Sequence, residues 1–75
     1  MKIKEYYDLP TMVSFRQYYE DGEVERIYGI AYMDFIICAC CGGRLNIAEL
    51  IADEEDGDDL GFEELDWVSF NEYIR

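Results

Sequence analysis

The sequence has no histidine, one proline and only six basic residues against eighteen acidic ones. Without histidine it lacks the side chain that most often acts as a general acid or base near neutral pH. It also has no glycine-rich phosphate loop and no activated nucleophile, and we expect no enzymatic activity. Its longest uncharged stretch, residues 35–43, is far shorter than the roughly 20 residues of a membrane-spanning helix. No apolar secretory segment follows Met1, and we expect a cytoplasmic protein without a membrane segment.

The acidic excess gives a formal net charge of −12 in 75 residues. A surface of that charge repels phosphate, whereas nucleic-acid affinity depends on clustered Lys and Arg. We therefore expect no direct binding of nucleic acid. The charge favours a basic protein surface as partner, because long-range attraction speeds association.

The length predicts one small acidic domain over residues 1–75, with a thin core. Seven Tyr, four Phe and one Trp are too many apolar side chains for a disordered chain. Domains of this size often need a metal, disulfides or oligomerisation. We expect an α+β fold: an antiparallel sheet of three to four strands with one or two short helices, stabilised by a metal.

An Asp21-Gly22 pair predicts a hairpin between strands at 12–20 and 23–31. With Glu20 opposite Glu23, Phe15 would face Tyr28. Residues 1–10 would form an extended lead-in ending at Pro10.

A third strand over 35–40 would return through a turn at Met33-Asp34. Beyond it, Asn46 suits a helix N-cap, although the same spacing also fits a strand. Residues 53–59 would form a loop. The final expectation is a strand or extended segment over 60–70, anchored by Leu65, Trp67 and Val68, with Ser69 or Asn71 capping a terminal turn.

The three cysteines fall in one run, Cys38-Ala-Cys40-Cys41-Gly42-Gly43. Cys38 and Cys41 have the C-x-x-C-G spacing of a zinc knuckle, in which a tight turn places two thiolates on one ion and backbone N–H groups bond the sulfurs. Cys40 is a third candidate ligand. These residues predict a structural zinc site at Cys38, Cys40 and Cys41.

A structural zinc ion prefers four ligands. The remaining ones could come from Asp34, from the acidic loop, from Asp66 or from a second copy of the chain, so both a monomer and a metal-sharing homodimer remain open. The alternative is that the cysteines are small buried thiols at the end of a strand. A redox or nucleophilic role is disfavoured, because no His or nearby Lys would lower a thiol pKa.

Between residues 49 and 66, ten of eighteen positions are acidic and none is basic. The run lacks the alternating oxygen ligands of an EF-hand. It predicts either a solvated loop that maintains solubility or a surface for a groove lined by Lys and Arg. The candidate partner-binding residues are Glu49, Asp53, Glu54, Glu55, Asp56, Asp58, Asp59, Glu63 and Glu64.

The stretch Ile37-Cys38-Ala39-Cys40-Cys41-Gly42-Gly43, followed by the acidic tract in a small acidic chain, resembles the phage-encoded type II-A anti-CRISPR proteins. These include a metal-binding inhibitor of the RNA-guided nuclease. The resemblance implies a stoichiometric inhibitor in the host bacterial cytoplasm. Its acidic surface would engage a basic surface of the CRISPR nuclease and block DNA loading, and its zinc would be structural. The alternative function is a zinc-stabilised structural or adaptor module whose charge serves only solubility.

Overall fold

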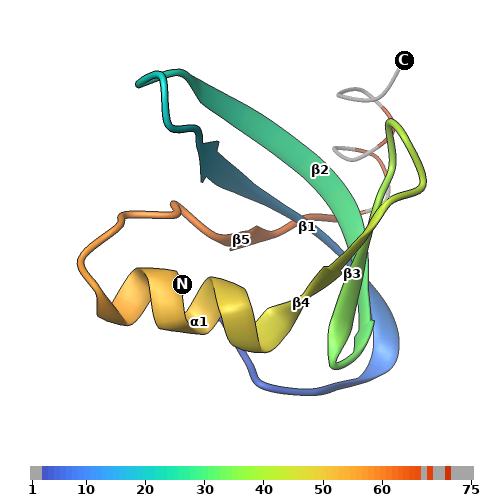
Figure 1. Ribbon diagram of the computed structural model, residues 1–75. Coiled ribbons are helices and arrows are strands. Elements are labelled where there is room, and N and C mark those ends of the chain that lie inside the picture. Colours follow the sequence, from blue (N-terminus) through green and yellow to red (C-terminus); the bar gives the residue numbers. More distant parts are fainter. Residues whose placement is uncertain (1–2, 67, 69–70, 72–75) are drawn as a thin grey trace.

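The computed structural model describes residues 3–66 together with Val68 and Asn71. These residues form one antiparallel sheet in the order β4-β3-β2-β1-β5, with a helix on one of its faces (Figure 1). The part of the chain described thus has the expected α+β character, with five strands and one helix. The elements are β1 (Tyr7–Tyr18), β2 (Val24–Met33), β3 (Phe35–Cys38), β4 (Arg44–Asn46), α1 (Ile47–Glu55) and β5 (Glu63–Glu64).

The core lies between α1 and the sheet face that it covers. Val13 and Phe15 alternate along β1 on the core face and are both fully buried. Ser14, between them on the other face, is buried as well. Each large apolar side chain contributes about 1.5–3 kcal/mol when fully buried. The buried cluster consists of Ile3, Tyr7, Val13, Phe15, Ala31, Ile36, Ile47, Leu50, Leu60 and Phe62.

The register of the β1–β2 hairpin differs by one residue from the predicted one. Phe15 pairs with Ile27 rather than with Tyr28. Because side chains alternate between the faces of a sheet, this one-residue shift exchanges the faces of β2. Ile27 and Ala31 pack with the core, whereas Tyr28 and Ile30 lie on the other face.

The shift arises in the connecting loop, which the sequence predicted as a two-residue turn. The last pair of the ladder is Tyr18 with Val24, so the loop spans residues 19–23. The Tyr19 N–H donates to the Glu23 carbonyl at 2.9 Å, and the Asp21 carboxylate accepts the Glu23 N–H at 3.0 Å. An aspartate whose side chain accepts the backbone N–H two residues ahead stabilises a longer turn. The prediction of a two-residue turn did not take this bond into account.

The predicted boundary at Pro10 is also wrong, because β1 begins at Tyr7 and runs through the proline. The pairing with β2 is irregular between Tyr7 and Thr11. A proline cannot donate to a ladder, and it is tolerated where a bulge interrupts the pairing. The irregular segment therefore accommodates Pro10 within one long strand.

The turn at Met33-Asp34 is confirmed. Tyr32 pairs with Phe35 across it, and Met33 adopts a φ of 55°. The strand that follows ends at Cys38 rather than at residue 40. The cysteine run therefore begins inside a strand and continues into a turn.

The helix predicted from Asn46 is confirmed. The Asn46 side chain accepts the Ala48 N–H at 3.0 Å and caps α1. The predicted loop at 53–59 is wrong for residues 53–55, which complete the helix. Ile47, Leu50 and Ile51 have helical spacing on the core side, and their burial outweighs the repulsion among the neighbouring carboxylates.

Among the described residues of the predicted strand or extended segment over 60–70, Glu63 and Glu64 form β5. The prediction is wrong at Val68, which is helical. Leu60 and Phe62 provide the buried anchors of the segment, whereas Val68 is 67% exposed. Trp67 and Ser69 lie outside the described residues. No helix in the described part of the chain is long and apolar enough to cross a membrane.

Candidate functional site

The first candidate site is the cysteine turn, which we define as residues 38–43 between β3 and β4. The Cys38 N–H donates to the Gly43 carbonyl at 2.8 Å, and the Gly42 N–H donates to the Cys38 carbonyl at 2.9 Å. Gly42 has a φ of 72°, a conformation that side chains resist. The turn is therefore closed by backbone bonds that require glycine at this position.

The backbone of the cysteine turn is directed at its own sulfur atoms. The backbone N–H groups of Cys41 and Cys40 and the Cys41 thiol lie near the Cys38 sulfur and act to lower the pKa of its thiol. The Gly43 N–H lies 3.4 Å from the Cys41 Sγ atom. Burial disfavours ionisation of Cys38, yet the groups of Cys40 and Cys41 outweigh it and lower the pKa of the thiol. This arrangement matches the N–H···S pattern expected of a knuckle.

The three cysteines do not occupy equivalent positions. Cys38 is buried at 8% exposure, whereas Cys40 and Cys41 are exposed, and all three are free thiols. The alternative of buried structural thiols therefore describes Cys38 alone. Within residues 3–66, 68 and 71, no group of three or more Cys, His, Asp or Glu side chains is placed to hold one metal ion.

The carboxylates proposed as further ligands lie elsewhere in the fold. Asp34 precedes β3, at the opposite end of that strand from Cys38. The acidic tract leads to β5, which is separated from β3 by two strands of the sheet. The described structure thus brings together Cys38 and Cys41 as a pair, without Cys40 completing a three-ligand group.

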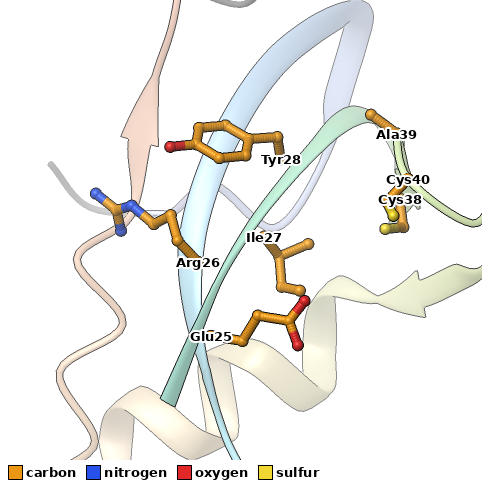
Figure 2. A pocket seen from close by; sticks show the side chains of 7 residues that line it. All are labelled: Glu25, Arg26, Ile27, Tyr28, Cys38, Ala39 and Cys40. Carbon is orange, nitrogen blue, oxygen red and sulfur yellow. The ribbon is translucent and has the colours of Figure 1, made fainter. Parts of the chain in front are cut away.

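Two shallow cavities border the cysteine turn. One of 440 Å³ is lined by Cys38, Cys40 and the first half of β2, and one of 290 Å³ by Cys38, Cys41 and Arg44. Figure 2 shows the first, in which Arg26 and Tyr28 point to one side of β2 and Glu25 and Ile27 to the other.

The nearest carboxylate to the turn along β2 is already engaged. Glu25 accepts a hydrogen bond from the Tyr19 hydroxyl at 2.9 Å, and this bond raises the pKa of Tyr19. The charge of Glu25 also opposes ionisation of Cys38. Glu25 therefore influences the thiol electrostatically while bonding another residue.

The second candidate site is the acidic surface, which we define as Glu49, Asp53, Glu54, Glu55, Asp56 and Asp58. It covers the outer side of α1 and the turn that follows. All of these residues are exposed except Glu54, which is half-buried. Glu49, Asp53 and Asp56 are spaced by four and three positions, which places them along one side of the helix.

The basic residues of the described chain contact groups other than the six carboxylates of this surface. Each contacts a carboxylate or an aromatic ring in another part of the fold. These contacts are Arg16–Asp59 at 3.1 Å, Arg26–Glu63 at 3.8 Å, Lys4 over the Tyr7 ring at 5.7 Å and Arg44 over the Phe35 ring at 4.1 Å.

Two predicted partner-binding residues, Asp59 and Glu63, therefore have structural contacts. Arg16 and Arg26 face each other across β1 and β2, and their ion pairs with these carboxylates relieve that like-charge pairing. Arg26 also donates to the Gly61 carbonyl at 3.0 Å. We call these two ion pairs, Arg16–Asp59 and Arg26–Glu63, the arginine clamp. The sequence did not predict it, because only the shifted register brings the two arginines opposite each other.

The cysteine turn and the acidic surface lie beyond opposite ends of β4, as Figure 1 shows. The first presents sulfur atoms and the second presents carboxylates, so they suit different ligands. Comparison of the chain with protein-family models, with curated proteins and with solved structures found no match in any of the three.

Proposed function

We propose that this protein is a stoichiometric binding inhibitor whose acidic surface engages a basic groove on a partner protein. The partner suggested by the sequence resemblance is an RNA-guided CRISPR nuclease, whose heteroduplex channel is positively charged. The inhibitor would act by occupying that surface and blocking DNA loading, without catalysis.

The observation that carries this proposal is the placement of carboxylates at the wrong end of α1. Glu54 and Glu55 lie in the last turn, which has no basic residue. Acidic groups near a helix C-terminus oppose the helix dipole and cost about 0.3–1 kcal/mol each. A surface optimised only for stability would carry Lys or Arg there. The cost supports a role for these charges outside the folded chain.

The spacing of the charges suits a basic groove. Glu49 and Asp53 are about 6 Å apart along the helix axis and Asp53 and Asp56 about 4.5 Å, from the rise of 1.5 Å per residue. These intervals are longer than the rise of about 3.4 Å per phosphate along one strand of DNA, so the row carries fewer charges per unit length than a nucleic acid strand. A row of carboxylates at such intervals could satisfy Lys and Arg side chains that otherwise hold a nucleic acid backbone.

The test is the association rate of the purified chain with a type II-A nuclease bound to its guide RNA. We expect binding at low salt, with a rate that falls on the order of tenfold as salt screens the charges. Cleavage of target DNA should fall in step with occupancy. Absence of binding at low salt would refute the proposal.

A charge-matched pair of variants locates the surface. The triple variant Glu49→Gln, Asp53→Asn, Asp56→Asn should slow association on the order of tenfold. The control Glu5→Gln, Asp8→Asn, Glu20→Gln removes the same charge from exposed positions outside the acidic surface. Equal effects of the two variants would mean that net charge, and not this surface, directs binding.

The second candidate function is a zinc-stabilised structural or adaptor module. The closed turn that brings Cys38 and Cys41 to one cavity, with the Gly43 N–H directed at the Cys41 sulfur, favours it. This function needs no contribution from the acidic surface. The variant Cys41→Ser separates the two functions: an inhibitor that acts through the acidic surface should still bind the nuclease, whereas a zinc-stabilised module should lose its metal.

A further inference from the structure

We propose that two copies of this chain share one zinc ion through Cys38 and Cys41 of each copy. The ion would have four sulfur ligands in a tetrahedral arrangement, which is a stable coordination for structural zinc. This inference does not depend on the acidic surface or on any partner of it.

The first argument is preorganisation of the thiol pair. Cys38 and Cys41 line the same 290 Å³ cavity, backbone hydrogen bonds close the turn between them, and the Gly43 nitrogen lies 3.4 Å from the Cys41 Sγ atom. Such donors stabilise thiolates and orient them toward a metal, in the manner of the outer-shell partners of known sites. Little further ordering of the turn would accompany binding.

The second argument is the number of ligands. Two thiolates leave half of the coordination of a structural zinc ion to be filled. No third Cys, His, Asp or Glu of the described residues is grouped with the pair. A second copy offers an identical pair, and two-fold symmetry is the commonest arrangement of identical chains. Two turns facing each other would complete the site.

The third argument is access. Cys41 is exposed and the cysteine turn connects the edge strand β4 to β3, as Figure 1 shows. Between Asp34 and Glu49 the sequence has no acidic residue, which is its longest interval without one. Arg44 adjoins the turn within this interval. Glu25 of β2 still borders the turn, so two copies of a chain with a net charge of −12 repel each other there, and the positive charge of the bound ion offsets that repulsion.

The charge of the chain then sets the sign of the salt dependence. Two acidic copies repel each other, and salt screens that repulsion. Zinc-dependent dimerisation should therefore strengthen as salt rises, by roughly threefold or more between about 50 mM and 500 mM. Attraction to a basic partner weakens over the same range. Failure of one proposal can thus be distinguished from failure of the other.

The experiment adds zinc to the full chain in the presence of a phosphine reductant and measures mass under native conditions. We expect a species of twice the 8.9 kDa chain mass with half a zinc ion per chain, and reversal by a chelator. Each thiol releases its proton to the buffer as it binds, so binding should weaken at lower pH. Cobalt(II) in place of zinc should give the visible absorption of a tetrahedral thiolate site.

Three variants assign the ligands. Cys41→Ser changes an exposed side chain, and it should abolish the dimer and weaken zinc binding by at least about a hundredfold. Cys40→Ser is the matched control and should leave both unchanged, whereas Glu25→Gln should keep the dimer and strengthen zinc binding slightly, because it removes a charge that opposes ionisation of Cys38. Circular dichroism checks that each variant is folded, and the cobalt spectrum of the unaltered chain gives a second readout that needs no mutation.

Several results would overturn the proposal. One zinc ion per single chain would indicate a mononuclear site, and loss of binding in Cys40→Ser or Glu25→Gln would assign a different ligand set. A dimer that survives chelation but not reduction would be a disulfide. Absence of zinc binding by the reduced chain would remove the site altogether.

Discussion

A Cβ atom at Gly29 would lie 2.6 Å from the carbonyl oxygen of Ile37 on the neighbouring strand. Gly29 is buried in the middle of β2 and pairs with Val13 on one side and Cys38 on the other. The clash would be with the backbone of Ile37, which cannot move aside without distorting the pairing of β2 with β3. The close approach of β2 and β3, which places Cys38 at the start of the cysteine turn, therefore requires glycine at this position.

We expect Gly29→Ala to destabilise the fold by about 1–3 kcal/mol, the range typical of overpacking in a core. The midpoint of urea unfolding measures the change. Gly57→Ala is the control, since its Cβ would meet no atom within 4 Å while its φ of 108° carries conformational strain. A smaller loss at Gly29 than at Gly57 would contradict the steric argument.

The carboxylates at the C-terminal end of α1 should destabilise the fold, and removing one of them should stabilise it. Glu55→Gln should raise the free energy of unfolding by a few tenths of a kcal/mol, because it removes a carboxylate from the negative end of the helix dipole. Glu49→Gln should lower it by a similar amount, because Glu49 lies in the first turn. Urea unfolding of the two variants at low salt compares them, and effects of the same sign would rule out the dipole as the cause.

The ion pair of Arg16 with Asp59 should contribute little to stability. Their side chains are 41% and 82% exposed, and exposed pairs typically contribute less than about 1 kcal/mol. The Arg16 Nε atom is buried without a hydrogen-bond partner. We expect Arg16→Met to change the free energy of unfolding by about 1 kcal/mol or less. Thermal unfolding measures it, and a much larger loss would indicate that Arg16 is central to the fold.

Alkaline conditions should expose the role of Tyr7. Burial raises the pKa of its phenol, the charge of Glu64 raises it further, and the Lys4 N–H bond acts in the opposite direction. The folded state therefore favours the protonated phenol. That contribution is fully present below the ordinary pKa of 10.0 and is lost as pH rises through the higher pKa of the folded state.

The variant Tyr7→Phe isolates this effect. At neutral pH it should lose about 0.5–1.5 kcal/mol with the Lys4 hydrogen bond, which is 3.2 Å long. Above pH 10 the difference from the unaltered chain should shrink, because phenylalanine has no proton to lose. Urea unfolding over a pH series measures both slopes, and parallel slopes would exclude Tyr7 as the titrating group.

Local chemistry made part of this fold predictable. Asn46 predicted the start of α1, and Met33-Asp34 predicted the turn between β2 and β3. The C-x-x-C-G spacing predicted a tight turn with an N–H group directed at a cysteine sulfur. Each depends on residues within a few positions of one another. Such features can be predicted because they do not depend on strand register or on contacts between distant parts of the sequence.

The errors depend on contacts that are distant in the sequence or on a single side-chain bond. The Asp21–Glu23 bond lengthened the hairpin loop and moved Phe15 from Tyr28 to Ile27. That shift in turn created the arginine clamp on the loop before β5. Without this register, nothing in the sequence distinguishes Asp59 and Glu63 from the other carboxylates of the acidic tract. Their ion pairs with the two arginines therefore could not be predicted.

The pairing of Val13 with Glu64 joins β1 to β5, a strand that lies at the edge of the sheet and far from β1 in the sequence. A ribosome adds about 5–20 residues per second, so the outer edge of β1 would wait roughly 3–10 s during synthesis before β5 exists to cover it. Through that interval the nascent chain would present an open strand edge, the kind of template that recruits other chains. Production of this protein should therefore respond to translation speed and to chaperones that shield unfinished sheets.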